Sequence, residues 1–499
     1  MNRFKILLFA MWLLTSTVLA QSPVTLSIGT RSRTFEIPYD FAGLGFETSA
    51  EIPDTSGVSG HLFSPTNTQL ITLFTNSGIR NLRVGGGTVD GLDAAVPTHA
   101  DIDNLFGFAQ AAGIKVIYSL RLLNGSPTAG AATAKYIWSH YQSSLDCFSI
   151  GNEPNEPPYR ETPSGAITNY VEYLAAWKIF AAAVTSVVPG TKFAGPDAGG
   201  TNWVEQFASD ESASGTVAFI TYHEYTGGRP FINPMHDEMP ASQAIDNMLS
   251  ANWDTNKYPA FYTKRRVFNK PDRFPFRMTE ANDYLRGVTN ASDAFASALW
   301  ALDFMHWWAA HGFAGVNFHN NQHETWLKTD TIYLDGPSRE YRINPKAYAI
   351  RAFDLGSHGW VEPVVMGNTN GLNLTAYAVG DETNLYVTII NREHGARARN
   401  ATVTISPEGL TAKNAAVMFL SSSNGDAGAT SGVTLGGGTI PNDAPWDGQW
   451  TALNSMTNQP CTIIVPATSA AVVKLTTEGK NNPASGIVSA GISRQDKPE

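Results

Sequence analysis

Cysteine is scarce in this sequence. The 499 residues include only Cys147 and Cys461, which stand far apart in the chain. A disulfide-stabilised scaffold is therefore excluded, and so is a cysteine-rich zinc site. We expect both cysteines to be small residues of a hydrophobic core.

Positive charge is also in short supply. Lysine and arginine total 34 against 44 aspartate and glutamate residues, which gives a formal net charge of −10. A surface of this sign repels nucleic acids and other strongly anionic polymers. We therefore expect no nucleic-acid partner.

The first twenty residues contain an apolar run, Ile6 to Leu14, preceded by Arg3 and Lys5. The run is short for a membrane span, and small residues ending at Ala20 follow it. This pattern predicts a secretory signal, residues 1–20, with an uncleaved membrane anchor as the alternative. We expect a secreted or periplasmic protein that has no membrane association after cleavage.

Between about Asp40 and Ser357, short apolar runs alternate with longer helical stretches. This alternation is typical of a parallel sheet wrapped by helices. The eight runs expected to form strands are Phe41–Phe46, Ile79–Val84, Lys115–Leu120, Asp146–Gly151, Lys192–Gly195, Phe219–Tyr222, Phe276–Thr279 and Gly315–Phe318. Eight strand–helix units predict an α/β fold, a (β/α)8 TIM barrel over residues 40–357. Its active site would lie at the carboxyl ends of the strands.

From residue 358 to about 478 the sequence changes to alternating Val, Ile, Thr and Tyr segments separated by turn residues. This pattern predicts an all-β domain, which we interpret as a β-sandwich. Val24–Ile37 alternates in the same way, so residues 21–39 are expected to add strands to that domain. Residues 479–499 are polar and are predicted to form a disordered tail.

The strongest local signal is the segment 148–154, Phe-Ser-Ile-Gly-Asn-Glu-Pro, in which an apolar strand ends abruptly. Proline cannot continue a strand ladder, so the Glu153 carboxyl is expected to face the barrel mouth. A glutamate that only caps a loop is the alternative. The position at the fourth of eight strands favours a catalytic acid.

A second carboxylate, Glu280, ends the seventh predicted strand in the segment 276–282, Phe-Arg-Met-Thr-Glu-Ala-Asn. Two carboxylates that converge across a barrel mouth can cleave a glycosidic bond, because one protonates the leaving oxygen while the other attacks the anomeric carbon. The sequence therefore predicts Glu153 and Glu280 as a catalytic pair. The alternative is two unrelated exposed glutamates.

Asn152-Glu153-Pro154 together with Thr279-Glu280 resembles the retaining glycoside hydrolases of clan A, in which the acid/base follows an asparagine on strand four and the nucleophile ends strand seven. The whole chain resembles glycoside hydrolase family 79, which contains β-glucuronidases and heparanases. The segments that carry this narrower resemblance are Gly43–Glu47, Leu82–Asp90, Tyr222–Tyr225, Glu280–Tyr284 and Val316–His319. The resemblance implies a carbohydrate substrate that contains β-linked glucuronic acid, in some members 4-O-methylated.

Two residues are expected to support the catalytic pair. Asn152 is predicted to hydrogen-bond the 2-hydroxyl of the sugar, or else to satisfy the loop backbone. Arg83, near the end of strand two, is predicted either to hold Glu280 ionised or to pair with a structural acid inside the barrel. The glycines at 85–87 permit a positive φ or a close backbone approach, and they lack the spacing of a dinucleotide site.

Strand six ends in Tyr-His-Glu-Tyr, residues 222–225, where alternate side chains face the same side. By the resemblance, Tyr225 is expected to contact the nucleophile, with a packing role as the alternative. His223 is interpreted as a hydrogen-bonded barrel histidine, with a metal ligand as the alternative. His319, His323 and Glu324 come closest to a metal-ligand cluster, but their loop is rich in Asn and Gln, which favours a sugar-binding loop. We therefore predict no metal site and no cofactor.

Recognition of the sugar is assigned to strand ends and to the loop after Glu280. Glu47 and Asp90, at the ends of strands one and two, are expected to bind hydroxyls. Tyr284 and the loop through Gly287 are expected to bind a carboxylate. Further cationic candidates, unless they are merely solvated, are Arg286, Lys328 and Arg121.

Taken together, the sequence predicts a secreted retaining exo-β-glucuronidase with Glu153 as acid/base and Glu280 as nucleophile. The alternatives within the class are a heparanase-like endo-β-glucuronidase and another β-glycosidase of the clan. The negative net charge counts against a long sulfated substrate, which needs a basic cleft. From another class, the chain could be a carbohydrate-binding protein with an inactive barrel. The oligomeric state is not predicted.

Overall fold

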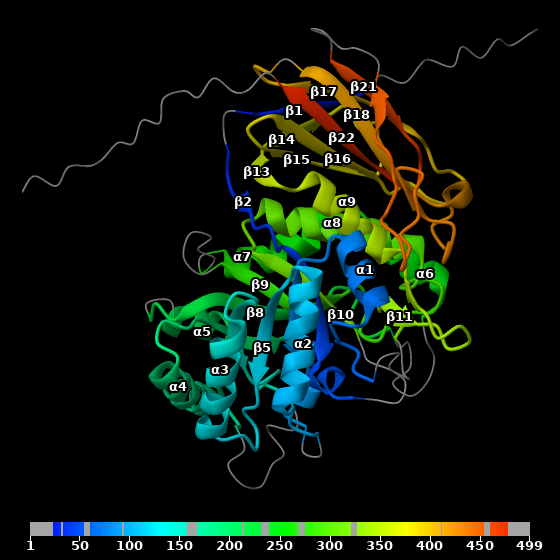
Figure 1. Ribbon diagram of the computed structural model, residues 1–499. Helices are drawn as coiled ribbons and strands as arrows, with labels where there is room; N and C mark the ends of the chain where they lie inside the picture. The colour runs from blue at the N-terminus through cyan, green and yellow to red at the C-terminus, as the bar shows by residue number, and fades with distance from the viewer. Residues whose placement is uncertain are drawn as a thin grey trace, which may run out of the picture.

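The computed structural model describes residues 23–477, apart from 31–32, 54–59, 92–93, 157–166, 212–213, 231–238, 267, 269–274, 321–326, 411 and 454–459. The predicted signal segment, the predicted tail, His323 and Glu324 lie outside these described residues. All eight predicted barrel strands are present and close into a parallel barrel (Figure 1). In chain order they are β3 (Ala42–Glu47), β4 (Asn81–Gly85), β5 (Lys115–Leu120), β6 (Leu145–Ile150), β7 (Phe193–Gly199), β8 (Val217–Tyr225), β9 (Phe276–Asn282) and β10 (Gly315–Asn320).

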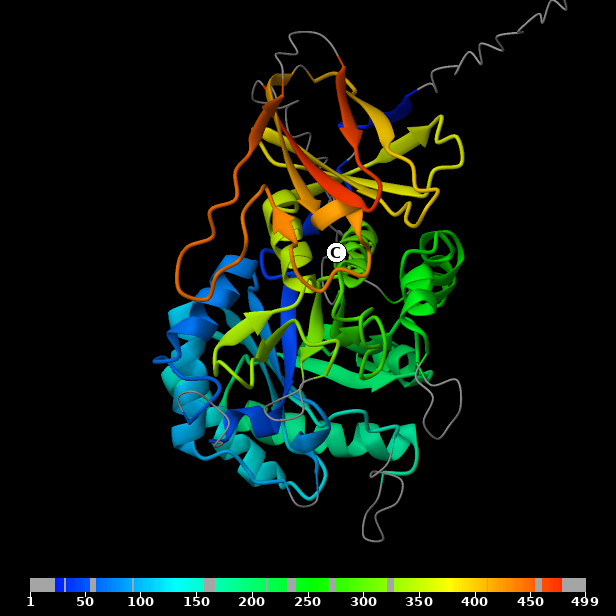
Figure 2. The same ribbon diagram turned by 90° about the vertical axis from the view of Figure 1, so that its right-hand side faces the viewer.

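Helices cover the outside of the barrel (Figures 1 and 2). They are α1 (Thr68–Ser77), α2 (His99–Ala112), α3 (Pro127–Tyr141), α4 (Tyr170–Val187), α5 (Trp203–Glu211), α6 (Ala241–Met248), α7 (Tyr258–Arg265), α8 (Phe295–Ala310) and α9 (Lys346–Gly356), with the short helices η1 (Thr48–Glu51), η2 (Gly87–Val89) and η3 (Trp253–Lys257). Helix α2 shows how local sequence sets its bounds, because Thr98 and Asp101 form a capping box and Gly113 ends the helix with φ +69°. Within the described chain, no helix has the length and hydropathy needed to cross a membrane.

The second domain is the predicted sandwich of two sheets, and the N-terminal segment contributes a strand to each sheet. The smaller sheet has the order β14 (Val364–Gly367), β1 (Val24–Ile28), β17 (Ala401–Pro407) and β21 (Cys461–Val465). The larger has the order β19 (Thr434–Leu435), β18 (Ala412–Ser421), β22 (Ser469–Thr477), β16 (Asn384–Asn391), β15 (Leu374–Gly380), β13 (Gly359–Glu362) and β2 (Glu36–Ile37), with β20 (Thr451–Leu453) beside β18. Cys147 and Cys461 are both buried and unbridged, as predicted.

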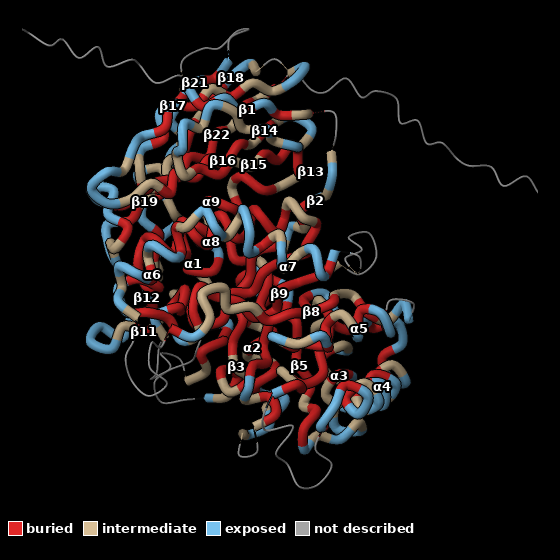
Figure 3. Tube along the Cα trace, turned by 180° about the vertical axis from the view of Figure 1, so that it is seen from behind, coloured by how far each residue is buried: buried red, intermediate tan, exposed pale blue. Residues whose placement is uncertain are grey.

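Helices α8 and α9 lie between the barrel and the larger sheet of the sandwich (Figures 1 and 3). All of α8 except its last residue is buried, which explains why its sequence is apolar on every side. Tyr39, just before β3, stacks on His358 with ring centroids 5.4 Å apart. Arg80, just before β4, lies 3.6 Å from Asp354 of α9. The amino ends of these strands therefore face the sandwich, and the barrel mouth opens on the other side.

Candidate active site

The two predicted glutamates meet at the barrel mouth. Glu153 follows β6, and Glu280 lies near the end of β9. One carboxylate oxygen of each, together with a ring nitrogen of His223, lie within 4.8 Å of one another. Glu280 is buried, whereas the Glu153 side chain is 33% exposed, so solvent or a ligand reaches the pair from the Glu153 side.

The backbone around Glu153 is shaped by an unusual turn. Glu153 has φ +44°, and Asp197 at the end of β7 has φ +52°. The Glu153 N–H donates to the Asp197 carbonyl oxygen at 2.7 Å, which helps to hold both residues in this left-handed region. Non-glycine residues in this region carry strain that tends to collect at functional sites.

Arg83 organises the buried side of the site. Its side chain is fully buried and projects from β4. Nη1 donates to Glu280 Oε2 at 3.0 Å, and Nη2 donates to Asn152 Oδ1 and lies 3.5 Å from Asp197 Oδ2. Both interpretations of Arg83 therefore describe contacts that it makes, one with Glu280 and one with a buried acid. Because Asn152 Oδ1 accepts a hydrogen bond from Arg83, the Asn152 amide nitrogen points away from the guanidinium.

Glu280 is surrounded by groups that favour its ionised form. Tyr225 donates its hydroxyl hydrogen to Glu280 Oε1 at 2.7 Å. Burial by itself raises the pKa of Glu280, but the charges of His319, His223 and Arg83 and the Tyr225 hydrogen bond outweigh burial and lower the pKa to about 2. The predicted contact between Tyr225 and the second carboxylate is present.

His223 lies between three carboxylates. Its Nδ1 is 2.9 Å from Glu153 Oε1 and 3.8 Å from Glu280 Oε2, and its Nε2 is 3.8 Å from Asp197 Oδ1. Burial lowers the pKa of His223, but Glu280, Asp197 and Glu153 raise it more strongly, to about 9. At neutral pH the ring is therefore a cation that hydrogen-bonds Glu153.

The same three groups could offer ligand atoms to a metal ion. A histidine must be neutral to bind a metal, and the raised pKa of His223 opposes that form. Glu280 already receives a guanidinium nitrogen of Arg83. Arg83 and His223 thus already neutralise the carboxylates that a metal ion would need, so these three residues are a poor fit for a metal site.

Glu47 and His319 form the neighbouring wall of the site. His319 Nε2 is 3.7 Å from Glu47 Oε1, and its Nδ1 is 3.8 Å from Glu280 Oε2. Thr88 donates both its backbone N–H and its hydroxyl to Glu47 Oε2 at 2.8 Å. Gly86 has φ +64°, and a Cβ there would collide with the Glu47 carboxyl. Within the glycine run, Gly86 thus shows both of the properties expected, a positive φ and a close approach.

Asp90 is buried and holds backbone together. Its carboxylate accepts N–H bonds from Leu122 at 2.8 Å, Leu123 at 2.7 Å and Asn152 at 3.0 Å. Burial raises its pKa to about 7 despite these bonds. Asp90 therefore ties the end of β5 to the residue that precedes Glu153, and its role as a sugar ligand stays a prediction.

The predicted carboxylate-binding loop is arranged differently from expectation. Tyr284 is buried, its ring packs on Gly227, and its hydroxyl donates to the Ala244 carbonyl oxygen of α6 at 3.4 Å. Gly287 has φ +82° and packs against residues 328–329. The Tyr284 hydroxyl is thus engaged by a helix, and neither residue contacts the Glu153–Glu280 pair in the described chain.

Two cationic candidates are also engaged. Arg121 donates to the carbonyl oxygens of Gly91, Ala94 and Leu123, and Lys328 pairs with Asp293 at 3.4 Å. Arg286 is exposed and has φ +67°. Arg286 and Lys328 are therefore both open to solvent, whereas Arg121 is partly buried.

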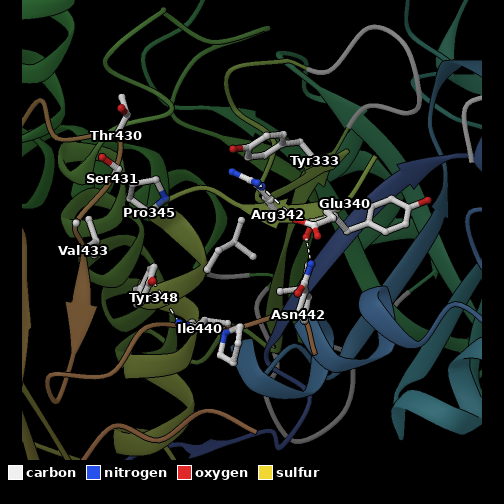
Figure 4. Close-up of a pocket in the computed structure, with 15 residues that line it drawn as sticks. Tyr333, Glu340, Arg342, Pro345, Tyr348, Thr430, Ser431, Val433, Ile440 and Asn442 are labelled. Atoms are coloured by element: carbon white, nitrogen blue, oxygen red, sulfur yellow. Dashed lines mark hydrogen bonds and ion pairs between the residues drawn. The ribbon is translucent and has the colours of Figure 1, made fainter. Parts of the chain in front are cut away.

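A cavity of about 340 Å³ lies away from these residues, between the hairpin β11 (Ile332–Leu334) and β12 (Tyr341–Ile343), the start of α9 and the sandwich segment 430–442 (Figure 4). Its lining includes Tyr333, Arg342 and Asn442, and it includes none of the predicted site residues. The carboxylate pair and this cavity are therefore separate features.

Sequence reasoning missed Asp197 and Lys346. Asp197 stands in Gly-Pro-Asp-Ala-Gly, residues 195–199, at the end of a predicted barrel strand, and that position was the available signal. Lys346 is buried and donates to Asn282 Oδ1 at 2.7 Å and to the Thr329 carbonyl oxygen at 2.8 Å. It fastens the end of β9 to the segment that follows β10, and its sequence context carried no signal.

The fold, a (β/α)8 barrel joined to a β-sandwich, is shared with solved structures of glycoside hydrolases. The chain superimposes on a 4-O-α-L-rhamnosyl-β-D-glucuronidase from Fusarium oxysporum with a TM-score of 0.67 and 16% identity, over 90% of this chain and 100% of that one. It also superimposes on a family 51 arabinofuranosidase from Xanthomonas axonopodis (TM-score 0.62, 15% identity, 91% and 100% coverage). A third match is a monomeric β-xylosidase from Caulobacter crescentus (TM-score 0.58, 14% identity, 91% and 99% coverage).

No protein-family model matches the sequence, and no curated protein matches it. At 14–16% identity, the structural likeness establishes the fold, and the chemistry has to be argued from the site itself.

Proposed function

We propose that this protein is a retaining exo-β-glucuronidase, with Glu153 as acid/base and Glu280 as nucleophile. The observation that carries the proposal is the approach of the two carboxylates, whose nearest oxygens are within 4.8 Å of each other. Retaining enzymes hold their carboxyl groups about 5–5.5 Å apart, whereas inverting enzymes need about 6.5–9.5 Å to admit a water molecule between carboxylate and sugar.

In the first step, Glu280 attacks the anomeric carbon while Glu153 protonates the leaving oxygen. Arg83 and Tyr225 each hold one oxygen of Glu280, so the carboxylate is aimed as well as ionised. The exposure of Glu153 suits an acid that must reach the leaving group on the solvent side. The product of this step is a glycosyl ester on Glu280.

In the second step, Glu153 acts as the base that deprotonates a water molecule, and this water releases the sugar from Glu280. The ester bond removes the negative charge of Glu280, so His223 and Arg83 lose one of their carboxylate partners at this stage. As Glu280 becomes free again, the same two cations stabilise the returning charge.

The choice of a glucuronide rests on the sequence segments that resemble glycoside hydrolase family 79 and on the similarity to a rhamnosyl-glucuronidase. Membership of that family and secretion through the predicted signal are parts of the same proposal. Mass spectrometry of the N-terminus of the exported protein tests the second part, since it detects cleavage after Ala20.

A neutral-sugar β-glycosidase is the second candidate, and one observation favours it. The Tyr284 hydroxyl donates to the backbone of α6, which removes a donor expected for the uronic-acid carboxylate. Arabinofuranosidases and xylosidases among the structural neighbours share the fold. This candidate retains both catalytic glutamates and changes only the sugar.

A panel of nitrophenyl β-glycosides decides between the two candidates. A site built for a carboxylate leaves polar groups unpaired when a neutral sugar enters, so we expect kcat/KM for the β-glucuronide to exceed that for the β-glucoside at least ~100-fold. Equal or higher rates on β-xyloside or β-glucoside would reject the glucuronidase and leave the retaining mechanism standing.

Azide rescue separates the roles of the two glutamates. With Glu153→Ala, azide is expected to intercept the glycosyl ester and give a β-glycosyl azide of retained configuration. With Glu280→Ala, azide can only replace the nucleophile, so any product is expected to be the inverted azide. The opposite pairing of product and variant would reverse the assignment.

A further inference from the structure

Asp197 is a buried acidic residue at the barrel mouth. It lies on β7, is 1% exposed, and is surrounded by groups from three other strands and from the segment after β6. Its Oδ1 accepts the Thr279 hydroxyl at 2.6 Å and is 3.8 Å from His223 Nε2, and its Oδ2 is 3.5 Å from Arg83 Nη2. Thr279 directly precedes Glu280 in the chain.

The main chain of Asp197 is also engaged with the site. Its carbonyl oxygen accepts the Glu153 N–H at 2.7 Å, and its own N–H donates to Thr221 Oγ1 at 2.8 Å. One residue thus contacts the backbone of the proposed acid/base, the strand that carries the proposed nucleophile, and the two cations that lie against them. A substrate in the mouth cannot touch its buried carboxylate.

We propose that Asp197 is a positioning residue for the double displacement: its charge keeps His223 cationic and holds Arg83 in place against Glu280. The proposal rests on the glycosidase function proposed above. The sugar never meets Asp197, and its effect reaches the reaction through His223, Arg83 and the Glu153 backbone.

The charges of the site support this role. Two buried cations, Arg83 and protonated His223, face the buried carboxylates of Glu280 and Asp197, while the third carboxylate against His223, Glu153, is partly exposed. Arg83 leads the groups that hold the pKa of Asp197 well below its ordinary value, against the effect of burial, so Asp197 carries a negative charge at neutral pH. When Glu280 is esterified, Asp197 is the buried carboxylate that still faces both cations.

The groups that set the charge of His223 come from several strands. They are Glu153 after β6, Asp197 on β7, Glu280 on β9 and, through Glu280, Arg83 on β4 and His319 on β10. Of the three carboxylates in direct contact, Asp197 takes no part in bond making. It is therefore the one whose charge can be removed without removing a reacting group.

The test compares Asp197→Asn with Asp146→Asn. Asp146, on β6, is a partly buried barrel carboxylate whose Oδ2 accepts the Asn81 side-chain amide at 3.1 Å, so the control makes the same chemical change in the same barrel. In Asp197→Asn we expect the NMR titration midpoint of His223 to fall from near 9 by at least about one pH unit, because a negative partner is lost. In Asp146→Asn the midpoint is expected to stay in place.

Activity provides the second readout. In Asp197→Asn, kcat for the nitrophenyl glycoside is expected to fall about 10²-fold with a smaller change in KM, because the lost charge supports the transition state. The alkaline limb of the kcat/KM profile is expected to move to lower pH with the His223 midpoint. An unchanged His223 midpoint with an unchanged pH profile would overturn the proposal, even if the melting temperature falls.

Two further measurements keep the proposal testable if Asp197→Asn does not fold. In the unaltered protein, a His223 midpoint at or below 6.5, its ordinary value, would reject the proposal outright. In Asp197→Glu, which retains the charge but displaces it, the raised midpoint is expected to persist while kcat falls. The titration needs no substrate, so lack of turnover by the unaltered protein would reject the glycosidase function without deciding the role of Asp197.

Discussion

Two buried arginines invite comparison, one at the barrel mouth and one where the barrel meets the sandwich. Arg83 lies between Glu280, at 3.0 Å, and Asp197, at 3.5 Å. Arg392, which directly follows β16, lies between Asp254 of η3, at 2.6 Å, and Asp303 of α8, at 3.2 Å. Each guanidinium is almost fully removed from solvent and faces two carboxylates.

The difference is in what surrounds the carboxylates. At the junction, Asp303 accepts hydroxyl hydrogens from Thr375 at 2.6 Å and Tyr377 at 2.8 Å, and Asp254 takes two Arg392 nitrogens. At the mouth, the network continues through His223 to Glu153, which is one-third exposed. At the junction, where the polar groups are enclosed, the arginine and its two carboxylates join the two domains. At the mouth, where one edge is open, the same arrangement favours the ionised form of Glu280.

The largest effect is expected from Glu280→Gln at the mouth. Loss of the nucleophile should lower glycoside hydrolysis by at least ~10⁴-fold, since groups that act as one catalytic unit fail together. The amide retains the shape of the carboxylate but removes the charge that buried Arg83 and His223 face, so the urea midpoint should fall as well, and the rate is compared for the folded fraction. Steady-state rates with a nitrophenyl glycoside measure this effect. Residual activity above about 1% of the unaltered protein that co-purifies with the variant would contradict the role of Glu280.

Arg392→Ala should instead destabilise the contact between the barrel and the sandwich and so lower the unfolding free energy. It leaves Asp254 and Asp303 buried without their cation, and losing one partner of a buried pair costs about 3–5 kcal/mol of unfolding free energy. Urea unfolding measures the loss, and kcat of the folded fraction should not change. The matched control is Arg399→Ala, which removes a partly exposed pair with Glu393 and should cost about 0–1 kcal/mol. Equal losses in the two variants would refute the contrast.

The mouth should also impose a pH dependence on stability. The pKa of His223 rises in the folded protein from 6.5 to about 9, so its contribution is fully present below pH 6.5 and is lost as the pH rises toward 9. The pKa of Glu280 falls from 4.5 to about 2, so its contribution is present above pH 4.5 and is lost as the pH falls toward 2. Urea unfolding at pH 5.5, 7.5 and 9 should show the alkaline loss.

His223→Asn provides the control for that alkaline loss. One proton taken up on folding gives a slope of at most about 1.4 kcal/mol per pH unit, and the variant should lack this slope between pH 6.5 and 9. A variant with the same slope as the unaltered protein would assign the loss to other groups.

A smaller stability effect than that of Arg392→Ala is expected from removing one hydroxyl at each place. Tyr377→Phe and Tyr225→Phe each delete a hydroxyl that donates to a buried carboxylate, so each should cost about 1 kcal/mol of unfolding free energy. Only Tyr225→Phe should lower kcat, by roughly 10- to 100-fold, because its partner is the proposed nucleophile. Similar kcat values for the two variants would show that Tyr225 merely packs.

The barrel strands were predictable because a strand buried on both faces reads as an apolar run, and parallel strands of a barrel are of this kind. Lys115–Leu120 matches β5 at both ends, and Val24–Ile37 yields the two strands expected for the sandwich. The convergence of Glu153 and Glu280 was predictable for a similar reason, since each stands where an apolar run stops and all such ends meet at one mouth.

Other features depended on three-dimensional packing. No spacing rule brings Asp197, His223 and Arg83 to one point, because they belong to three different strands whose register is set by barrel closure. The orientation of the Tyr284 side chain was equally unpredictable from the sequence, because Gly227 provides the space for its ring and α6 provides the acceptor for its hydroxyl. The sequence by itself thus determined the two domains and the pair of glutamates, because both follow from local apolar pattern and strand ends. The tertiary structure alone decided which charges surround that pair, because Coulomb interactions depend on distances that only the closed barrel defines.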